Sequence, residues 1–352
     1  MKKQKLSKKV IVAPLNWGLG HASRCIPMIQ ALLQNNFTPI IASDGKAFEF
    51  LQKEFPQLIF LELPSYGISY AKNLKWRLFL QLPKIFSVVK KEKKVIARFL
   101  EKNKDVVGII SDNRFGVRNS KISSVYITHQ LNVLSGINTF FTSKIHQSII
   151  KKFDECWIPD TADSEFSGKL SSLKKSKINT QFIGVLSRFE KQDIPKTIDV
   201  LILLSGPEPH RTTLENKLIK VFENYVGTIV LVQGKIAEKP LKTIKNNISM
   251  YNYALSNTLE KLMNASKVVV CRSGYSSVMD LAVLDKKVFF IPTKHQTEQE
   301  YLAKYFSEKG LVPFATVEDF TQDDFQKLKS YTGLSTSKKE INSALFRFFH
   351  GK

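Results

Sequence analysis

The chain has 352 residues, more than one hydrophobic core usually serves, so two domains are expected. Hydrophobic residues make up 43% and charged residues 24%, a composition that excludes wholesale disorder. A formal net charge of +22 predicts a surface that attracts anionic partners, but charge alone does not separate nucleic acid, anionic lipid and phosphorylated substrates.

The first half of the chain alternates strand-like and helix-like segments. Helices are predicted over Ala22–Gln34 and Lys46–Glu54. Several of the intervening apolar runs are continuous, which is typical of parallel strands buried on both faces. The predicted strands are Val10–Pro14, Thr38–Ala42, Leu58–Leu63, Val106–Ser111, Val125–Thr128 and Glu155–Pro159.

A second series of strands begins after the polar stretch Ser187–Lys196. Its members are Asp199–Leu204, Thr228–Gln233, Ile248–Tyr251, Val268–Cys271 and Val288–Pro292. We therefore predict an α/β protein with two Rossmann-like, doubly wound domains that face a cleft. The N-terminal domain covers residues 1–186, a linker covers 187–197, and the C-terminal domain covers 198–352, with its last helix a candidate to return to the first domain.

The three cysteines, Cys25, Cys156 and Cys271, are far apart and form no CxxC pair. This pattern predicts neither a disulfide framework nor a zinc site, and it suits a reducing compartment such as the cytoplasm. We interpret the basic start of the chain as leading into the first strand rather than as a signal peptide, because its apolar run breaks at Pro14. No apolar stretch approaches the roughly 20 residues of a membrane-spanning helix.

The sequence Asn16-Trp17-Gly18-Leu19-Gly20-His21-Ala22-Ser23-Arg24 lies between the first strand and the first helix. Gly18 and Gly20 allow a tight turn and a close approach to a ligand, and the amides that open the helix favour an anion. A dinucleotide fingerprint would require a third glycine at Ser23, although Asp44 stands where a ribose-binding acid is expected. A tight turn without a ligand is the structural alternative.

Two motifs in the second half also join a strand to a helix. In the first, the amides of Ser273, Gly274 and Tyr275 would cradle a diphosphate, and Asp280, six residues after Gly274, would bind ribose hydroxyls from an exposed helix face. The alternative for Asp280 is an ordinary surface acid. The second motif runs from Ile291 to Ala303 and is rich in polar side chains that could bind sugar hydroxyls. The alternative is that these side chains only cap the helix and contact solvent.

The run VVVCRSG, an acid six residues on, and then IP, H, Q and Tyr-Leu-Ala resemble the C-terminal domain of glycosyltransferase family 28. The GLGH loop is similar to the N-terminal glycine-rich loop of that family, with Trp17 and Leu19 in place of further glycines. The resemblance implies a GT-B fold and an inverting transfer from a nucleotide-diphosphate sugar, UDP-linked by preference, without a catalytic metal or another cofactor. The acceptor cannot be carried over, and a lipid-linked or cell-envelope glycan is the candidate.

The resemblance also assigns roles to residues of this chain. Ser273 and Gly274 would contact the diphosphate, Asp280 the ribose, and the loop around Ser256 the nucleobase. Glu298 and Gln299 would contact the donor sugar. The full set of donor-side candidates is Gly206, Arg211, Ser256, Arg272, Ser273, Gly274, Tyr275, Asp280, His295, Glu298 and Gln299.

Inverting transfer needs a base that takes a proton from the acceptor hydroxyl. His21 is the best-placed candidate because a neutral imidazole accepts protons near pH 7. Asp112 and His129, which also follow strand-like segments, are its rivals, and His129 joins Gly18 and Gly20 as an acceptor or phosphate-loop candidate. A nucleotide-sugar epimerase on the same fold is the alternative function. A basic nucleic-acid-binding protein ranks lower, since no recognition motif accompanies the charge.

The segment Asn73–Lys94 combines apolar and basic residues as an interfacial helix does. We predict that it docks the first domain on an anionic membrane surface, with Pro83 dividing it into two short helices. The alternative is that its apolar residues pack against the first domain. Docking would make the protein peripheral on the inner face of the cytoplasmic membrane.

Overall fold

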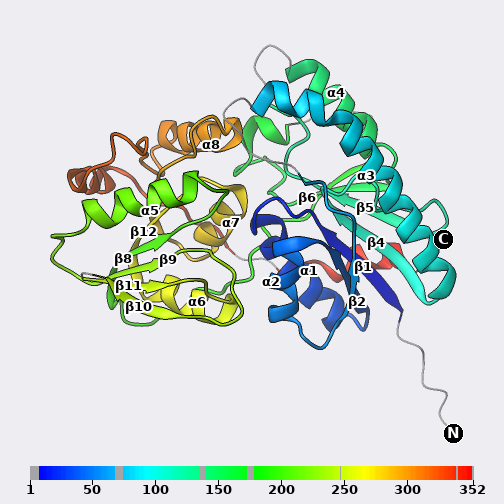
Figure 1. Ribbon diagram of the computed structural model, residues 1–352, viewed down its shortest axis with the longest axis horizontal. Coiled ribbons are helices and arrows are strands. Elements are labelled where there is room, and N and C mark those ends of the chain that lie inside the picture. The colour runs from blue at the N-terminus through cyan, green and yellow to red at the C-terminus, as the bar shows by residue number, and fades with distance from the viewer. Residues whose placement is uncertain are drawn as a thin grey trace, which may run out of the picture. The chain divides into compact units, whose positions relative to one another are not determined.

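The computed structural model describes residues 8–67, 74–134, 139–172, 178–245, 247–337 and 340–350, and omits the side chains of residues 74–82 and 141. The chain divides into two compact units (Figure 1). Unit 1 comprises Met1–Leu186 and Lys339–Lys352, and unit 2 comprises Ser187–Lys338.

Unit 1 contains seven strands and four helices among its described residues. The strands are β1 (Lys9–Pro14), β2 (Thr38–Ser43), β3 (Ile59–Glu62), β4 (Val106–Asp112), β5 (Ser123–Ile127), β6 (Glu155–Ile158) and β7 (Thr180–Phe182). The helices are α1 (Gly20–Gln34), α2 (Gly45–Glu54), α3 (Leu74–Lys102) and α4 (Thr139–Ile150), with a 3₁₀ turn η2 (Gly168–Leu170). The returning C-terminal segment adds a 3₁₀ helix, η4 (Ser343–Phe349).

The sheet of unit 1 is parallel, with strand order β3-β2-β1-β4-β5-β6-β7. The chain leaves β1 in one direction along the sheet, through β2 and β3, and then returns to the other side of β1 with β4. This reversal creates a switch point between β1 and β4, where ligands bind in doubly wound sheets. The loop after β1 and the last residue of β4, Asp112, therefore share this edge.

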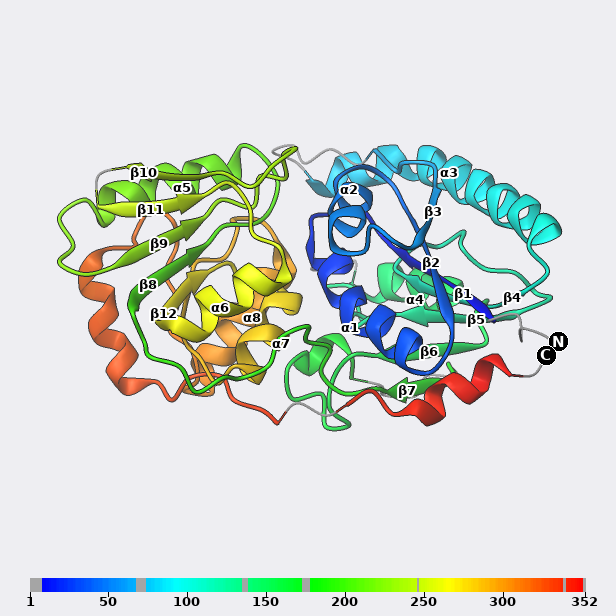
Figure 2. The same ribbon diagram turned by 90° about the horizontal axis from the view of Figure 1, so that it is seen from below.

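Helices cover both faces of this sheet (Figure 2). On one face Ile11 and Ile109 pack with Ile96 of α3. On the other face Gly108 leaves room for the ring of Phe349 in η4, because a Cβ at Gly108 would lie 2.2 Å from Phe349 Cδ1. The C-terminal segment is thus an integral layer of unit 1.

Unit 2 repeats the pattern. Its strands are β8 (Ile198–Leu203), β9 (Ile229–Val232), β10 (Lys242–Lys245), β11 (Ile248–Tyr251), β12 (Ser266–Cys271) and β13 (Lys287–Phe290). Its helices are α5 (His210–Val221), α6 (Ser256–Ala265), α7 (Tyr275–Val283) and α8 (Thr297–Glu308), followed by a 3₁₀ helix, η3 (Gln322–Ser330).

The strand order in unit 2 is β10-β11-β9-β8-β12-β13, and β10 alone runs antiparallel. The switch point lies between β8 and β12, so the loops after these two strands share an edge. Leu214 and Leu218 of α5 pack on Ile202 and Val270 of the sheet to form the core. The predicted α/β class with two Rossmann-like domains is confirmed.

Two short strands and one helix differ from the sequence prediction. The short strands β7 and β10 were not predicted, because neither is an apolar run; all four residues of β10 are exposed. The prediction that Pro83 divides its helix is wrong, since α3 continues from Leu74 to Lys102 with Pro83 inside it. No helix in the described ranges is both long and apolar enough to cross a membrane.

Candidate active site

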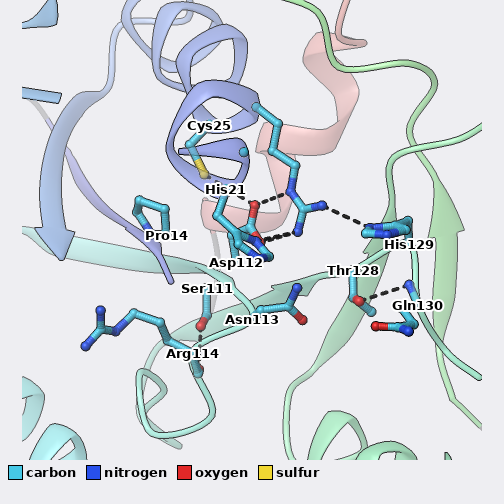
Figure 3. A network of polar contacts seen from close by, with 12 residues as sticks. Pro14, His21, Cys25, Ser111, Asp112, Asn113, Arg114, Thr128, His129 and Gln130 are labelled. Atoms are coloured by element: carbon cyan, nitrogen blue, oxygen red, sulfur yellow. Dashed lines mark hydrogen bonds and ion pairs between the residues drawn. The ribbon is translucent and has the colours of Figure 1, made fainter. Parts of the chain in front are cut away.

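Three predicted residues meet at the carboxyl edge of the unit 1 sheet. His21 lies in the first turn of α1, Asp112 ends β4, and His129 follows β5 by two residues. His21 Nδ1 lies 2.7 Å from Asp112 Oδ1, and Figure 3 shows this pair beside His129. The Asp112 side chain is fully buried, whereas the His21 side chain keeps 15% of its surface exposed. The arrangement is that of a base backed by a carboxylate.

Arg24 joins these three residues, and the sequence interpretation missed it. Its Nε donates to Asp112 Oδ2 at 2.5 Å, and its Nη2 donates to Asp112 Oδ1. Its Nη1 lies 3.0 Å from His129 Nδ1. Arg24 is one turn beyond His21 and is 97% buried, and the apolar run Cys25–Ile29 that directly follows it was the available signal.

Charges around Asp112 set the protonation of this cluster. Burial alone would raise the pKa of Asp112, but the positive charge of Arg24 and the His21 contact outweigh it and hold the pKa well below its usual range. Burial lowers the pKa of His21; Asp112 opposes this effect, and Arg24 adds to it. The net shift is downward, so His21 is a neutral proton acceptor near pH 7.

The loop before α1 is held by polar contacts to the next strand. Asn16 Nδ2 donates to Asp44 Oδ2 at 3.2 Å, and Arg114 Nη1 donates to Asp44 Oδ1 at 2.5 Å. Both carboxylate oxygens of Asp44 are therefore engaged, which argues against the dinucleotide interpretation. Gly18 has a φ of +74° and no neighbour within 4 Å of a built Cβ, so its backbone borders open space. Gly20 opens α1.

The predicted diphosphate cradle in unit 2 lies at the start of α7. Gly274 caps this helix, and a Cβ built on it meets no atom within 4 Å. Across the switch point, Gly206 after β8 has a φ of +97° and is equally open. The start of α7 thus borders a space that a side chain at Gly274 would fill, and a helix N-terminus beside such a space suits an anionic ligand.

Arg272 and Ser273 lie beneath this turn rather than in front of it. Arg272 is 1% exposed and donates to the carbonyls of Ile291, Pro292 and His210 at 2.9–3.0 Å. Its burial lowers the pKa of the guanidinium to about 10. The Ser273 hydroxyl donates to the Gln299 carbonyl at 2.7 Å. Both side chains brace the turn, so a ligand would meet the backbone here.

Asp280 is buried, and the expectation of an exposed helix face is wrong. Its side chain is 9% exposed, and its Oδ1 accepts a hydrogen bond from Ser187 Oγ at 2.7 Å. The physical reason is that Val278, Met279 and Leu281 around it make α7 apolar on nearly every side. Asp280 consequently ties the first residue of unit 2 to the helix that carries the cradle.

The remaining donor-side candidates are held by internal contacts. The Gln299 amide accepts from the Thr293 N–H at 2.8 Å and donates to Gln296 Oε1 at 2.6 Å. His295 has a φ of +67°, and its N–H donates to Glu300. Arg211 is paired with Glu208 and Glu215. Ser256 and Tyr275 begin α6 and α7, and Glu298 lies in the first turn of α8.

All three cysteines are free and buried. Burial raises the pKa of the Cys156 and Cys271 thiols to about 12, so neither is a ready nucleophile. Within the described ranges, no group of three or more His, Cys, Asp or Glu side chains could hold a metal ion.

Comparison with known proteins identifies the class. Residues 200–340 match the glycosyltransferase family 28 C-terminal domain. Two solved glycosyltransferases share the fold of the whole chain. The spinosyn forosaminyltransferase SpnP has a TM-score of 0.64 at 12% identity, covering 97% of this chain and 99% of SpnP. MurG of Acinetobacter baumannii has a TM-score of 0.51 at 12% identity, covering 91% and 89%.

Two curated relatives of the chain are N-acetylglucosamine transferases. The UDP-N-acetylglucosamine–N-acetylmuramyl-(pentapeptide) pyrophosphoryl-undecaprenol N-acetylglucosamine transferase of Haemophilus ducreyi is 21% identical over 206 residues, which span 56% of this chain and 55% of that enzyme. Its Haemophilus influenzae counterpart is 23% identical over 257 residues, or 70% of this chain and 69% of that enzyme. The chain has the GT-B fold, and it spans about half the length of the first curated relatives that it matches. Its second unit carries the family 28 domain, so the predicted resemblance to that family is confirmed.

Proposed function

We propose that this chain is an inverting glycosyltransferase that moves a hexosyl or N-acetylhexosaminyl group from a UDP-linked sugar to a hydroxyl group of a lipid-linked or cell-envelope glycan. The acceptor oxygen attacks the anomeric carbon, and its proton passes to His21 Nε2. The bond between the anomeric carbon and the diphosphate oxygen breaks, and its electron pair leaves with the nucleoside diphosphate.

The contact between His21 and Asp112 is the observation that carries this proposal. An ionised carboxylate 2.7 Å from Nδ1 keeps the proton of the neutral ring on that nitrogen, so Nε2 presents a lone pair. When Nε2 takes the acceptor proton, Asp112 stabilises the imidazolium that forms. The exposed part of His21 gives a substrate access to the ring.

The donor is assigned to unit 2. Amides at the start of α7 and the open space at Gly274 suit a diphosphate, where they would stabilise the charge of the leaving group without a metal. The names of the curated relatives pair a UDP-linked sugar with a pyrophosphoryl-undecaprenol acceptor, which supports UDP and a lipid-linked acceptor here.

A thermal-shift screen tests the donor assignment. A ligand at 100 times its dissociation constant adds about 2.7 kcal/mol to the free energy of unfolding, which is readily measured. We expect stabilisation by one nucleotide-diphosphate sugar, in EDTA as well as in Mg²⁺, and none by the free sugar. Stabilisation by NAD and by no nucleotide sugar would contradict the proposal.

Asp280→Ala is expected to weaken donor binding about tenfold or more, because we propose that this carboxylate, although only 9% exposed and bonded to Ser187, also accepts hydrogen bonds from the ribose hydroxyls. Isothermal titration with the nucleotide sugar measures the change. Ser187→Ala is the matched control: it removes the hydroxyl that donates to Asp280 but keeps the carboxylate. Equal weakening in both variants would mean that Asp280 acts by anchoring Ser187 and does not touch ribose.

The described part of α3 supports membrane docking of unit 1. Val88 packs with Leu15 and Tyr66, whereas Phe86 is 60% exposed. Unit 1 also carries well over half of the Lys and Arg residues but less than half of the Asp and Glu residues. The apolar side chains that we predicted before Pro83 lie outside the described residues. Between Pro83 and Lys94, the exposed basic residues of this helix are Lys84, Lys90, Lys91, Lys93 and Lys94.

We expect the protein to float with anionic vesicles at low salt and much less with neutral ones, because each basic residue near an anionic bilayer contributes about 1 kcal/mol that salt screens. Phe86→Ser with Lys90→Glu and Lys91→Glu should abolish flotation. Val226→Ser, which changes a 97% exposed apolar residue of unit 2, is the control. Flotation that survives the triple change would remove α3 from the docking surface.

A further inference from the structure

Arg24 makes contacts that restrict where the protons of two histidines lie. A guanidinium only donates hydrogen bonds, and it stays charged in proteins. Its Nη1 lies 3.0 Å from His129 Nδ1, so that nitrogen must present a lone pair. A neutral His129 then carries its proton on Nε2.

The same arginine acts on His21 through Asp112. Nε and Nη2 of Arg24 donate to the two oxygens of the Asp112 carboxylate. This bidentate pair fixes the plane of the carboxylate and keeps the group ionised. His21 Nδ1 lies 2.7 Å from Asp112 Oδ1 and 2.9 Å from Arg24 Nη2. The carboxylate requires a proton on Nδ1, because it can only accept a hydrogen bond, whereas the guanidinium requires a lone pair there, because it can only donate one. The carboxylate prevails, because a lone pair so close to an ionised oxygen would be repelled and Nη2 already donates to that oxygen.

The charged and titratable groups that face His21 come from three elements. Arg24 lies on its own helix, Asp112 ends β4, and His129 follows β5. Cys25 adds a weak contact, with its Sγ 3.6 Å from Asp112 Oδ2. Arg24 contacts Asp112 and both histidines, His21 and His129.

We propose that Arg24 is the positioning residue of this site and fixes opposite tautomers on its two histidines, with the proton on Nδ1 in His21 and on Nε2 in His129. The lone pair offered at the site then comes from His21, and His129 serves as an N–H donor. This inference rests on the proposed function for its catalytic meaning, but the tautomers themselves can be measured without substrate.

Histidine ¹⁵N NMR of the full chain tests it directly. Long-range ¹H–¹⁵N spectra distinguish protonated from bare ring nitrogens, and His21→Gln and His129→Gln assign the two rings. We expect His21 as the Nδ1–H tautomer and His129 as the Nε2–H tautomer. The same tautomer on both rings, or the reverse pair, would overturn the proposal. A protein with the expected tautomers but no transferase activity would instead refute the proposed function.

Two substitutions test this role of Arg24: Arg24→Gln removes the positive charge, and Arg24→Lys keeps the charge but removes the planar guanidinium. Arg24→Gln and Arg24→Lys should each release His129 into a mixture of tautomers and lower kcat about a hundredfold, with donor Kd changed by less than about twofold. Arg114→Gln is the matched control, because it removes another buried, ion-paired arginine of unit 1 that contacts neither histidine; its two histidine spectra should match wild type. If Arg24→Gln does not fold, the wild-type spectra and Arg24→Lys decide. Folded Arg24 variants with unchanged histidine spectra would overturn the assignment.

Discussion

His21→Ala is expected to lower kcat about a hundredfold or more while leaving the Kd of the nucleotide sugar within about twofold of wild type. A general base typically contributes a factor of about 10² to 10⁴ to the rate, and its loss is felt in the chemical step. The proposed donor-binding groups belong to unit 2, whereas His21 belongs to unit 1, so donor binding should survive. Steady-state kinetics with saturating donor and calorimetric binding measure the two effects separately.

His350→Ala provides the control for this substitution. His350 is an exposed histidine of unit 1 whose Nδ1 lies 3.3 Å from Nζ of Lys8, which directly precedes β1, whereas Asp112 ends the parallel strand β4 at the opposite edge of the sheet. Its loss should leave kcat unchanged. Near-normal turnover in His21→Ala would mean that another residue is the base.

The kcat/KM of the wild-type protein should rise with pH through the pKa of His21, which lies below its ordinary value of about 6.5.

Asp112→Asn is expected to reduce kcat by about 10³ to 10⁴, a loss of the size seen when the aspartate behind a catalytic histidine is amidated. The amide oxygen of asparagine would turn to Arg24, which leaves the amide NH₂ facing His21 Nδ1. That donor favours the tautomer with the proton on Nε2, so the lone pair needed for catalysis is lost. Single-turnover kinetics measure the effect.

The same substitution should also destabilise unit 1. Removing one partner of a buried ion pair costs about 3–5 kcal/mol, because Arg24 keeps a buried charge without its carboxylate. Asp160→Asn is the matched control: Asp160 is equally buried but accepts hydrogen bonds from Ser167 and Phe166. It should lower stability in urea without lowering the kcat of the folded fraction. Full activity in Asp112→Asn would contradict the tautomer argument.

The pH dependence of stability follows from the direction of the Asp112 shift. Its pKa in the folded chain lies below the unfolded value, so the unfolded state binds more protons as the pH falls. The stabilisation is therefore fully present above the ordinary aspartate pKa of about 3.9 and is lost as the pH drops below it. In Asp112→Asn, the free energy of unfolding should no longer show the decrease that Asp112 causes below a pH of about 3.9.

Most strands could be predicted from the sequence because parallel strands are buried runs with sharp ends. Val106–Ser111, for example, reads as such a run, and β4 extends it by Asp112 alone. The edge strand β10 could not be predicted in this way. Its four residues are exposed, so no apolar pattern marks it, although it pairs antiparallel with β11, which begins only three residues after β10 ends.

The candidate site was predicted in part. His21, Asp112 and His129 each follow a strand end, so the topology of a parallel sheet brings them to one edge. The role of Arg24 depends on a contact with Asp112, 88 residues along the chain, which no local pattern encodes. Asp280 looked like an exposed acid, but the packing of α7 buries it against Ser187.

A transfer assay with the full chain tests directly whether the protein is an inverting glycosyltransferase. The protein is incubated in EDTA with the stabilising nucleotide sugar and a polyprenyl-diphosphate glycan acceptor, and the products are followed by mass spectrometry and NMR. We expect one nucleoside diphosphate to be released per sugar added to the acceptor, with inversion at the anomeric carbon, and we expect His21→Ala to lose both signals. Conversion of the nucleotide sugar to its epimer, with no nucleotide released, would contradict this expectation.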